Sequence, residues 1–250
     1  MVSGKITFMG DYLVDMPESK FDESIRWKQI SMIFQGAMNS LDPVFTIQQQ
    51  FDEVLKQHGF DSNADKIIRD AINSVNLDYS VLEKYPHELS GGMKQRIVIA
   101  MALLLKPKFV IADEPTTALN VLVQATIINL LKNLKKKGMS LMLISHDLAI
   151  LSEVAEKIGI IYGGKMVEFG TSSEIFRNPK HPYTQGLLNS IPTLRKEKKL
   201  KFIPGSPPDL SDTKPGCRFF DRCPEAMEKC KTDPPKIKTD SGYVLCWLYE

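Results

Sequence analysis

One octet in the middle of the chain, LSGGMKQR at Leu89–Arg96, limits the fold more than any other stretch. Ser90 and two glycines precede an apolar run, which is typical of a helix N-terminus. Gly91 and Gly92 leave the backbone N–H groups of that helix end open, and the helix dipole favours negative charge there. The octet therefore predicts an anion-binding helix terminus suited to a γ-phosphate. An ordinary serine cap would explain Ser90 but not the whole octet.

Strands and helices alternate around this octet. We expect strands at residues 4–9, 30–34, 108–112 and 140–145, and helices within 46–86, from 91 to about 105, at 121–137 and after 147. Residues 159–170 are expected to form two strands joined by a Gly-Gly turn. Alternating strands and helices predict an α/β fold with a mostly parallel sheet.

Polar residues end three of the expected strands. FVIADEP ends in Asp113 and Glu114, ISHD carries His146, and Gln35 follows ISMIF. In a nucleotide hydrolase, the first carboxylate of such a pair holds Mg²⁺ and the second polarises the attacking water. His146 could reach a γ-phosphate or order the water. Taken singly, each residue also fits a merely structural role, such as a solvated acid after a buried strand.

The order of these motifs is more informative than any one of them. Gln35, LSGGMKQR, FVIADEP, TTALN and ISHD, in this sequence, resemble the ATP-binding subunit of an ABC transporter over residues 4 to about 190. The resemblance implies an ABC-type nucleotide-binding domain, with a RecA-like parallel-sheet core and a helical subdomain at about 46–105. It implies that Glu114 is the catalytic base, that His146 is the switch histidine, and that Asp113 and Gln35 hold Mg²⁺.

The same resemblance assigns a set of ATP-binding residues. These are Gln35, Leu89, Ser90, Gly91, Gly92, Gln95, Asp113 and Asn120. Asn120 departs from the family pattern, because the D-loop usually has Asp at this position. Asparagine keeps the hydrogen bonding and loses the charge that the family pattern has at this point of the dimer.

Other segments resemble the oligopeptide/dipeptide importer subgroup, namely QGAMNSLDPVFTI, EPTTALNVLVQATI, HPYTQGLLNSIP and GCRFFDRCPEAMEKC. The resemblance implies a peripheral subunit at the cytoplasmic face of the cell membrane that energises uptake of oligopeptides or dipeptides, with nickel or a sugar as alternative substrates. Its expected partners are a second ATPase subunit, transmembrane permeases and, indirectly, an extracytoplasmic peptide-binding protein. The expected domains are 1–192 (ATPase), 193–216 (Pro-rich basic linker) and 217–250 (four-cysteine region).

The phosphate-binding loop of this family, G-x-x-x-x-G-K-[ST], has two imitations here. Ser3-Gly4-Lys5 is followed by Ile6, and the glycine and lysine spacing of 159–165 is followed by Met166; both continue as strands. We expect the amino-terminal part of the domain to be missing, through a misplaced gene start, a truncated or split gene, or a fragment. A sheet without those strands would expose apolar faces. A rival hypothesis is then a non-catalytic subunit that supplies only its signature to a complete ATPase.

The four cysteines all lie in the last 34 residues. They are Cys217, Cys223, Cys230 and Cys246, and the first 216 residues have none. Their spacing is not the tight C-x2-C of a zinc ribbon, and four thiolates suit a [4Fe–4S] cluster. An iron–sulfur cluster is favoured over zinc, and free thiols are the remaining alternative.

Composition excludes two further classes. The net charge of +2 gives no global field that would favour nucleic acid as a partner. No apolar run reaches the roughly 18 residues that a membrane helix needs. Membrane association would therefore come through a partner.

Overall fold

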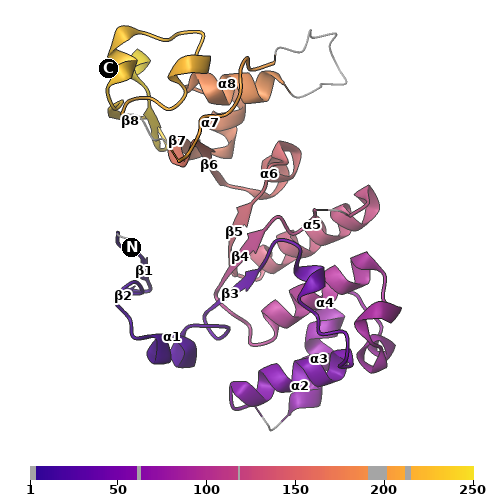
Figure 1. The fold of residues 1–250 in the computed structure, drawn as a ribbon. Coiled ribbons are helices and arrows are strands. Elements are labelled where there is room, and N and C mark those ends of the chain that lie inside the picture. The colour runs from indigo at the N-terminus through magenta and orange to yellow at the C-terminus, as the bar shows by residue number, and fades with distance from the viewer. Residues whose placement is uncertain (1–3, 61–62, 118, 191–201, 212–214) are drawn as a thin grey trace. The chain divides into compact units, whose positions relative to one another are not determined.

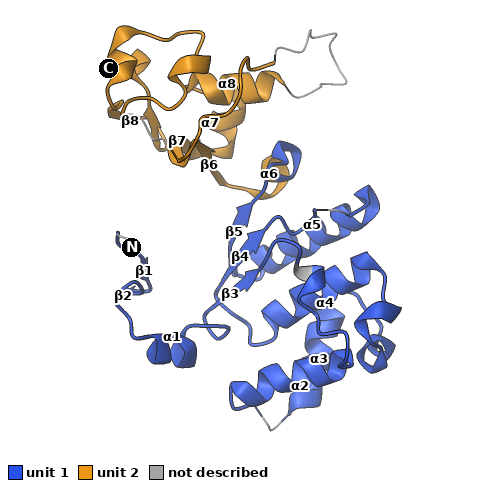
Figure 2. Ribbon diagram, in the orientation of Figure 1, with its two compact units in different colours: residues 1–150 blue, residues 151–250 orange. Residues whose placement is uncertain are grey.

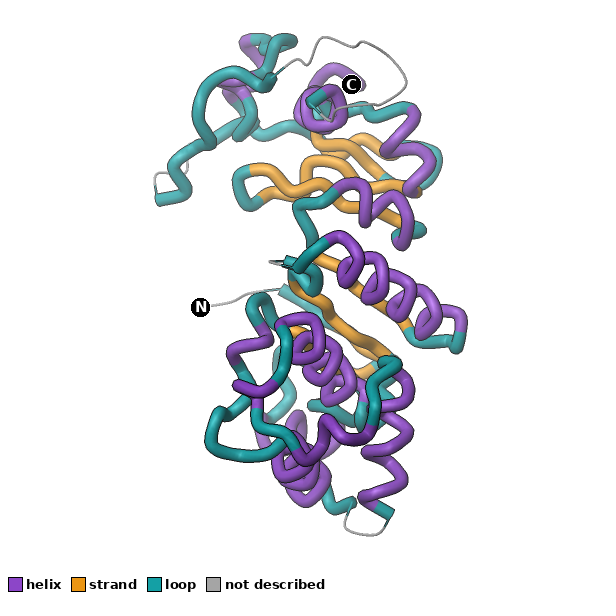
Figure 3. The backbone as a smooth tube through the Cα atoms, turned by 90° about the vertical axis from the view of Figure 1, so that its right-hand side faces the viewer, coloured by secondary structure: helices purple, strands orange, loops and turns teal. Residues whose placement is uncertain are grey.

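The computed structural model describes residues 4–60, 63–117, 119–190, 202–211 and 215–250. The chain divides into two compact units, residues 1–150 and 151–250 (Figure 2). Each unit contains both helices and strands (Figure 3). Part of the expected linker at 193–216, and Ser3 of the first phosphate-loop imitation, lie outside the described residues.

Unit 1 contains the sheet and the helices around the octet (Figure 1). Its strands are β1 Thr7–Phe8, β2 Asp11–Tyr12, β3 Ile30–Ile33, β4 Phe109–Asp113 and β5 Ser140–Ile144. Its helices are α1 Glu18–Ser24, α2 Ile47–Gln57, α3 Ala64–Ser74, α4 Gly91–Leu103 and α5 Val121–Lys136, and α6 Leu148–Val154 spans the boundary between the units. The expected elements are thus present with small differences at their ends, except for the strand expected at residues 4–9.

Strands β3, β4 and β5 form a parallel sheet with β4 in the middle. One face is buried, through residues such as Ile33, Val110 and Ala112. The apolar side chains of α2, α3 and α4 belong to the same hydrophobic core, which explains why α4 is apolar on nearly every side. This is the mixed α/β architecture that the alternation of elements predicts.

The other face of this sheet carries exposed apolar side chains. Met32, Phe34, Met142 and Ile144 are all at least one third exposed, and Phe34 reaches 60%. Parallel sheets are usually covered on both faces. This face of the sheet therefore exposes apolar side chains, and the absence of further strands beside it stays a prediction.

The first expected strand, at residues 4–9, is shorter than predicted. Only Thr7–Phe8 is a strand, and it pairs antiparallel with Asp11–Tyr12. Met9 and Gly10 both have positive φ, of 50° and 97°. Two such residues form the tight turn of a β-hairpin, so the chain reverses where the sequence suggested a continuous strand.

Unit 2 is built on an antiparallel sheet. Its strands are β6 Lys157–Tyr162, β7 Lys165–Thr171, β8 Lys236–Lys238 and β9 Tyr243–Leu245, in the order β6-β7-β9-β8. Its helices are α7 Ser172–Arg177 and α8 Pro182–Asn189. The hairpin predicted at 159–170 is present, and β7 also pairs with β9 of the cysteine-bearing region. The predicted domain boundaries at 192 and 216 stay predictions.

Candidate active site

The three parallel strands of unit 1 end at one edge of their sheet. Asp113, the last residue of β4, lies opposite Ile144, the last residue of β5, and Ile33 of β3 lies opposite Ala112. Because parallel strands share their carboxyl edge, the residues that follow them gather there. The edge therefore carries Gln35, Asp113, Glu114 and His146, all predicted to be functional.

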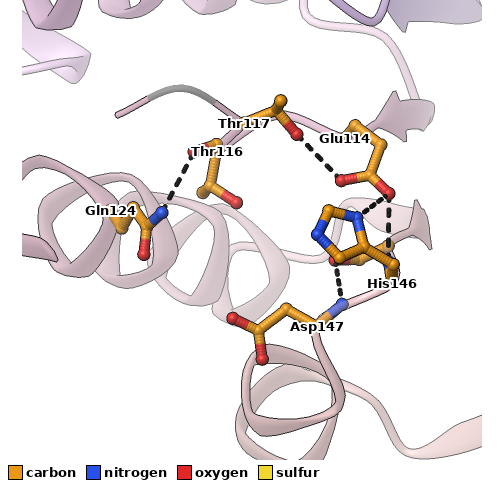
Figure 4. Close-up of polar contacts among 7 residues, drawn as sticks. Glu114, Thr116, Thr117, Gln124, His146 and Asp147 are labelled. Carbon is orange, nitrogen blue, oxygen red and sulfur yellow. Dashed lines mark hydrogen bonds and ion pairs between the residues drawn. The ribbon is translucent and has the colours of Figure 1, made fainter. Parts of the chain in front are cut away.

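Glu114 and His146 form the main contact at this edge (Figure 4). The Glu114 Oε1 atom lies 2.6 Å from His146 Nδ1 and accepts the backbone N–H of His146 at 3.0 Å. Its Oε2 atom accepts the hydroxyl of Thr117 at 2.9 Å. The histidine side chain is 79% exposed and the glutamate side chain only 13%. The pair thus has a fixed carboxylate and an imidazole that is open to solvent.

The backbone of Glu114 is left-handed, with φ of 48°. This conformation is uncommon for a residue with a side chain and costs free energy unless its neighbours hold it. Here the N–H of Glu114 donates to the carbonyl of Ile144 on the adjacent strand at 2.9 Å. The turn directs the carboxylate toward His146 rather than along the strand.

The contact between Glu114 and His146 shifts their pKa values in opposite directions. Burial alone would raise the pKa of Glu114, but hydrogen bonds from His146 and Thr117 outweigh it, so the pKa lies below its usual value. The hydrogen bond to Glu114, followed by its charge, raises the pKa of His146. Each group therefore favours the charged form of the other.

The octet forms a helix terminus, as its residue types predict. Ser90 caps α4, and its hydroxyl accepts the N–H of Met93 at 3.3 Å. Ser90 and Gly91 are exposed, whereas Leu89 is buried. A side chain on Gly92 would place its Cβ 2.9 Å from a methyl group of Val123 in α5, which explains the glycine there. The exposed terminus is free to contact an anion.

Gln95 and Asn120 have contacts that their assignment to ATP binding did not include. Gln95 is buried, and its Nε2 donates to the carbonyl of Pro115 at 2.7 Å. Asn120 caps α5, its Oδ1 accepting the N–H of Val123 at 2.9 Å. Neither contact tests a role toward ATP, which stays a prediction for both residues.

Two polar residues at this edge were missed by sequence reasoning. Thr117 contacts the carboxylate of Glu114, and Gln124 donates from α5 to the carbonyl of Thr116 (Figure 4). Gln124 also donates to the carbonyl of Leu119. The three-residue spacing between Glu114 and Thr117 was a signal, since a hydroxyl can reach back over one turn. No local sequence pattern predicted the contacts of Gln124.

The two imitations of a phosphate-binding loop do not lead into helices. Residues 4–6 precede the hairpin strand β1, and Lys165 begins β7. The Nζ of Lys165 lies 2.6 Å from the Asp233 carboxylate. Both segments therefore lack the helix that a phosphate loop requires.

All four cysteines line one small cavity of unit 2, of about 10 Å³. Its other walls include His181, Phe220 and Trp247. Such a volume has room for about one water molecule. No three His, Cys, Asp or Glu side chains of the described residues form a group able to hold a metal ion. The four thiols therefore line the same cavity but do not form a metal-binding group.

Burial favours the neutral forms of three of the cysteines and of the histidine at this cavity. Burial raises the pKa of Cys217 and Cys246, and raises that of Cys223 to about 11. Burial also lowers the pKa of His181 to about 4. The Nδ1 atom of His181 accepts the N–H of Tyr183 at 3.0 Å, so Nε2 carries the proton of the neutral ring. Sequence reasoning did not place His181 beside the cysteines.

Family models match two parts of the chain. The model "ABC transporter" matches residues 1–117, and "Oligopeptide/dipeptide transporter, C-terminal region" matches residues 167–230. The first includes Gln35, the octet, Asp113 and Glu114. The second includes three of the four cysteines.

Similar proteins match nearly the whole chain. The dipeptide transport ATP-binding protein DppD of Caldanaerobacter subterraneus is 44% identical over all of this chain and 79% of its own length. The oligopeptide transport ATP-binding protein OppD of Escherichia coli is 42% identical over 94% of this chain and 71% of its own length. The chain belongs to the ABC transporter ATP-binding family.

Solved structures agree with this membership at the level of the fold. The dimeric ATP-binding cassette MJ0796 bound to ADP and Pi superposes with a TM-score of 0.60, at 23% identity, over 68% of this chain and 74% of the other. Like its family, this ABC ATP-binding protein has a parallel-sheet core with helices. None of the helices in its described ranges has the length and apolar character needed to cross a bilayer.

Proposed function

We propose that this chain is the ATP-hydrolysing subunit of an importer for oligopeptides or dipeptides. The observation that carries the proposal is the Glu114–His146 pair, which lies beside Asp113 at the carboxyl edge of β3, β4 and β5. The peptide substrate comes from the names of the similar proteins and from the oligopeptide/dipeptide family model. Nickel or a sugar remains the alternative cargo, because the ATPase residues do not contact it.

Each residue of the edge has a proposed role. The side chains of Asp113 and Gln35 would hold Mg²⁺, whose charge offsets that of the phosphates of ATP. Carboxylate and amide oxygens at the ends of adjacent strands suit this ion. Glu114 takes a proton from the attacking water, and its low pKa keeps it ionised for this task. His146 holds the carboxylate through Nδ1 and presents Nε2 to the γ-phosphate.

The octet would act on the nucleotide of a partner subunit. Ser90, Gly91 and Gly92 offer a hydroxyl and free N–H groups at the positive end of α4. We propose a dimer of ATPase subunits, which contacts transmembrane permeases at the cytoplasmic face of the membrane and acts indirectly with an extracytoplasmic peptide-binding protein. Residues 1–192 would form the ATPase domain, 193–216 a linker and 217–250 a cysteine region.

The test is ATP hydrolysis by this chain, purified with the subunits that accompany it. We expect Glu114→Gln to abolish phosphate release while Mg-ATP still binds, because the amide cannot accept the proton of water. Glu83→Gln, an exposed acid outside this edge, is the matched control and should keep the wild-type rate. A Glu114→Gln complex that hydrolyses ATP normally would overturn the proposal.

The same experiment separates the non-catalytic alternative. Its support is the intact helix terminus at Ser90, which could serve a partner without any hydrolysis at Glu114. In that case the complex would lose activity with Ser90→Ala or Gly91→Trp but not with Glu114→Gln. The main proposal expects losses at both places.

For the cysteines we propose a [4Fe–4S] cluster. The support is that four free thiols line one cavity with aromatic walls. The donors fit the cluster chemically, but the described side chains do not form a metal-binding group, so no step of ATP hydrolysis is assigned to it. Anaerobic purification with analysis of iron, sulfide and zinc tests this. Iron and sulfide lost in Cys230→Ser would support the cluster, zinc alone would favour zinc, and neither would favour free thiols.

A further inference from the structure

The segment that follows Glu114 is held from two helices. Residues 115–119 lie between β4 and α5 and are neither helix nor strand where they are described. The carbonyl of Pro115 accepts Nε2–H of Gln95 on α4, at 2.7 Å. The carbonyls of Thr116 and Leu119 accept Nε2–H of Gln124 on α5, at 3.2 and 3.1 Å. Glutamine side chains therefore replace the backbone partners that regular structure would supply.

The contact made by Gln95 is the most protected of these. Gln95 is only 4% exposed, and Pro115 is buried as well. A buried carbonyl without a donor carries the full cost of its desolvation, so this bond is expensive to break. Pro115 directly follows Glu114, whose backbone is held in the left-handed region. A movement of Pro115 would therefore displace the adjacent Glu114 and its carboxylate.

The two helices also touch at their N-termini. The Cα of Gly92 lies so close to Val123 that a Cβ there would meet the valine methyl groups at 2.9 and 3.0 Å. Asn120 fixes the first turn of α5 by accepting the N–H of Val123. The exposed end of α4, the first turn of α5 and the described residues of 114–120 are therefore connected by close packing and by hydrogen bonds, of which the Gln95–Pro115 bond is buried.

We propose that Gln95 is a positioning residue that couples the exposed N-terminus of α4 to Glu114. A nucleotide held against Ser90 and Gly91 from a partner subunit would fix α4, and the Gln95–Pro115 bond would pass this on to the Glu114 turn. Gln124 supports the same segment from α5. The inference rests on the proposed role of Glu114 in hydrolysis.

The decisive variant is Gln95→Met, which has similar length and lacks the N–H donor. We expect kcat for ATP hydrolysis to fall about tenfold, the worth of one buried hydrogen bond. The KM for ATP should change less than about twofold, because the amide of Gln95 is buried and bonded to Pro115. Val123→Ala, which loosens the helix contact without removing a polar group, should lower kcat by a smaller factor in the same direction.

Gln185→Met is the matched control. Gln185 Nε2 also donates to two backbone carbonyls, of Pro179 and Lys180, but it lies in α8 of unit 2. We expect this variant to keep both kcat and KM. Thermal unfolding of each variant separates positioning from stability, because a structural role would lower the melting temperature and leave kcat per folded subunit unchanged.

Three results decide the matter. A lower kcat at constant KM and constant folded fraction supports the coupling. Wild-type kcat in folded Gln95→Met overturns it, even when Glu114→Gln is inactive. Normal hydrolysis by Glu114→Gln would instead overturn the proposed function itself, so the two failures are distinguishable.

Discussion

The edge of the parallel sheet and the cysteine cavity organise their polar groups in different ways. At the edge, Asp113 ends β4, and Glu114 and His146 follow β4 and β5, whose register is fixed along their whole length. Around the cavity, Cys223 and Cys230 lie at or within short 3-10 turns, and Cys246 follows the short strand β9. Regular strands turn sequence order into spatial order, whereas turns do not. The arrangement at the edge could therefore be predicted residue by residue, whereas for the cavity only the gathering of the four cysteines could be predicted.

The two regions also treat charge differently. The Glu114–His146 pair is open to solvent on the histidine side and favours two opposite charges. At the cavity, burial raises the pKa of Cys217, Cys223 and Cys246 and lowers that of His181, so it favours the neutral forms of these groups. The Glu114–His146 pair therefore favours charged side chains, whereas burial at the cavity favours neutral ones.

The largest expected effect compares the hydrophobic cores of the two units. Phe51 in unit 1 and Phe219 in unit 2 are both almost fully buried. Each change to alanine should lower the free energy of unfolding by about 3–5 kcal/mol, because it leaves a cavity. Urea unfolding followed by tryptophan fluorescence measures this, with Trp27 reporting on unit 1 and Trp247 on unit 2.

We expect Phe219→Ala to shift mainly the Trp247 signal and Phe51→Ala mainly the Trp27 signal. The matched control is the less drastic Phe219→Leu, which should produce a smaller shift at the same probe. If either alanine variant moved both signals equally, the two units would unfold as one, and the comparison between them would fail.

The next effect concerns hydrolysis. His146→Ala removes the side chain that holds the Glu114 carboxylate, and we expect kcat to fall about 100-fold. Cys230→Ser should leave kcat within about twofold, since no step of hydrolysis is assigned to the cavity. Phosphate release by the purified complex measures both. If kcat fell as much in Cys230→Ser as in His146→Ala, the cysteine cavity would contribute to hydrolysis.

Sequence reasoning reached the residues at strand ends for a physical reason. An apolar strand has a recognisable length, and the polar residues after it must lie at the carboxyl edge. The same reasoning could not show that Gln95 bonds to Pro115 or that His181 faces the cysteines, because these contacts join residues 20 or more positions apart and follow no repeat of a helix or strand. The hairpin at Met9 was also missed, since a methionine with positive φ has no sequence signal.

A smaller effect compares helix caps. Asn120 caps the first turn of α5 through Val123, and Thr171 caps α7 through Glu174. Alanine at either position should lower stability by about 1 kcal/mol, seen in the unit that holds it. Asn120→Asp should keep the cap, because a carboxylate also accepts the N–H and suits the helix dipole. If Asn120→Asp were as unstable as Asn120→Ala, capping would not explain this residue.

The smallest effect is the titration of two histidines, measured by NMR on the intact chain. His146 should titrate above the ordinary value of 6.5, and Glu114→Gln should bring its pKa back down. His181 should stay neutral to a pH of about 4. The variants His146→Ala and His181→Gln assign the two signals among the four histidines of the chain.

Opposite shifts imply opposite effects of pH on stability. His146 has a raised pKa, so its pairing stabilises the fold below pH 6.5 and is lost as the pH rises through the raised value. Glu114 has a lowered pKa, so its contribution to stability is present above pH 4.5 and is lost as the pH falls through the lower value.

His181 is neutral in the folded chain, whereas the unfolded histidine takes up a proton near pH 6.5. Unit 2 therefore loses stability as the pH falls from 6.5 toward about 4. Acidification should therefore shift the Trp247 unfolding transition in this range and leave the Trp27 transition less affected. A larger shift of the Trp27 transition than of the Trp247 transition would mean that burial of His181 does not govern how the stability of unit 2 depends on pH.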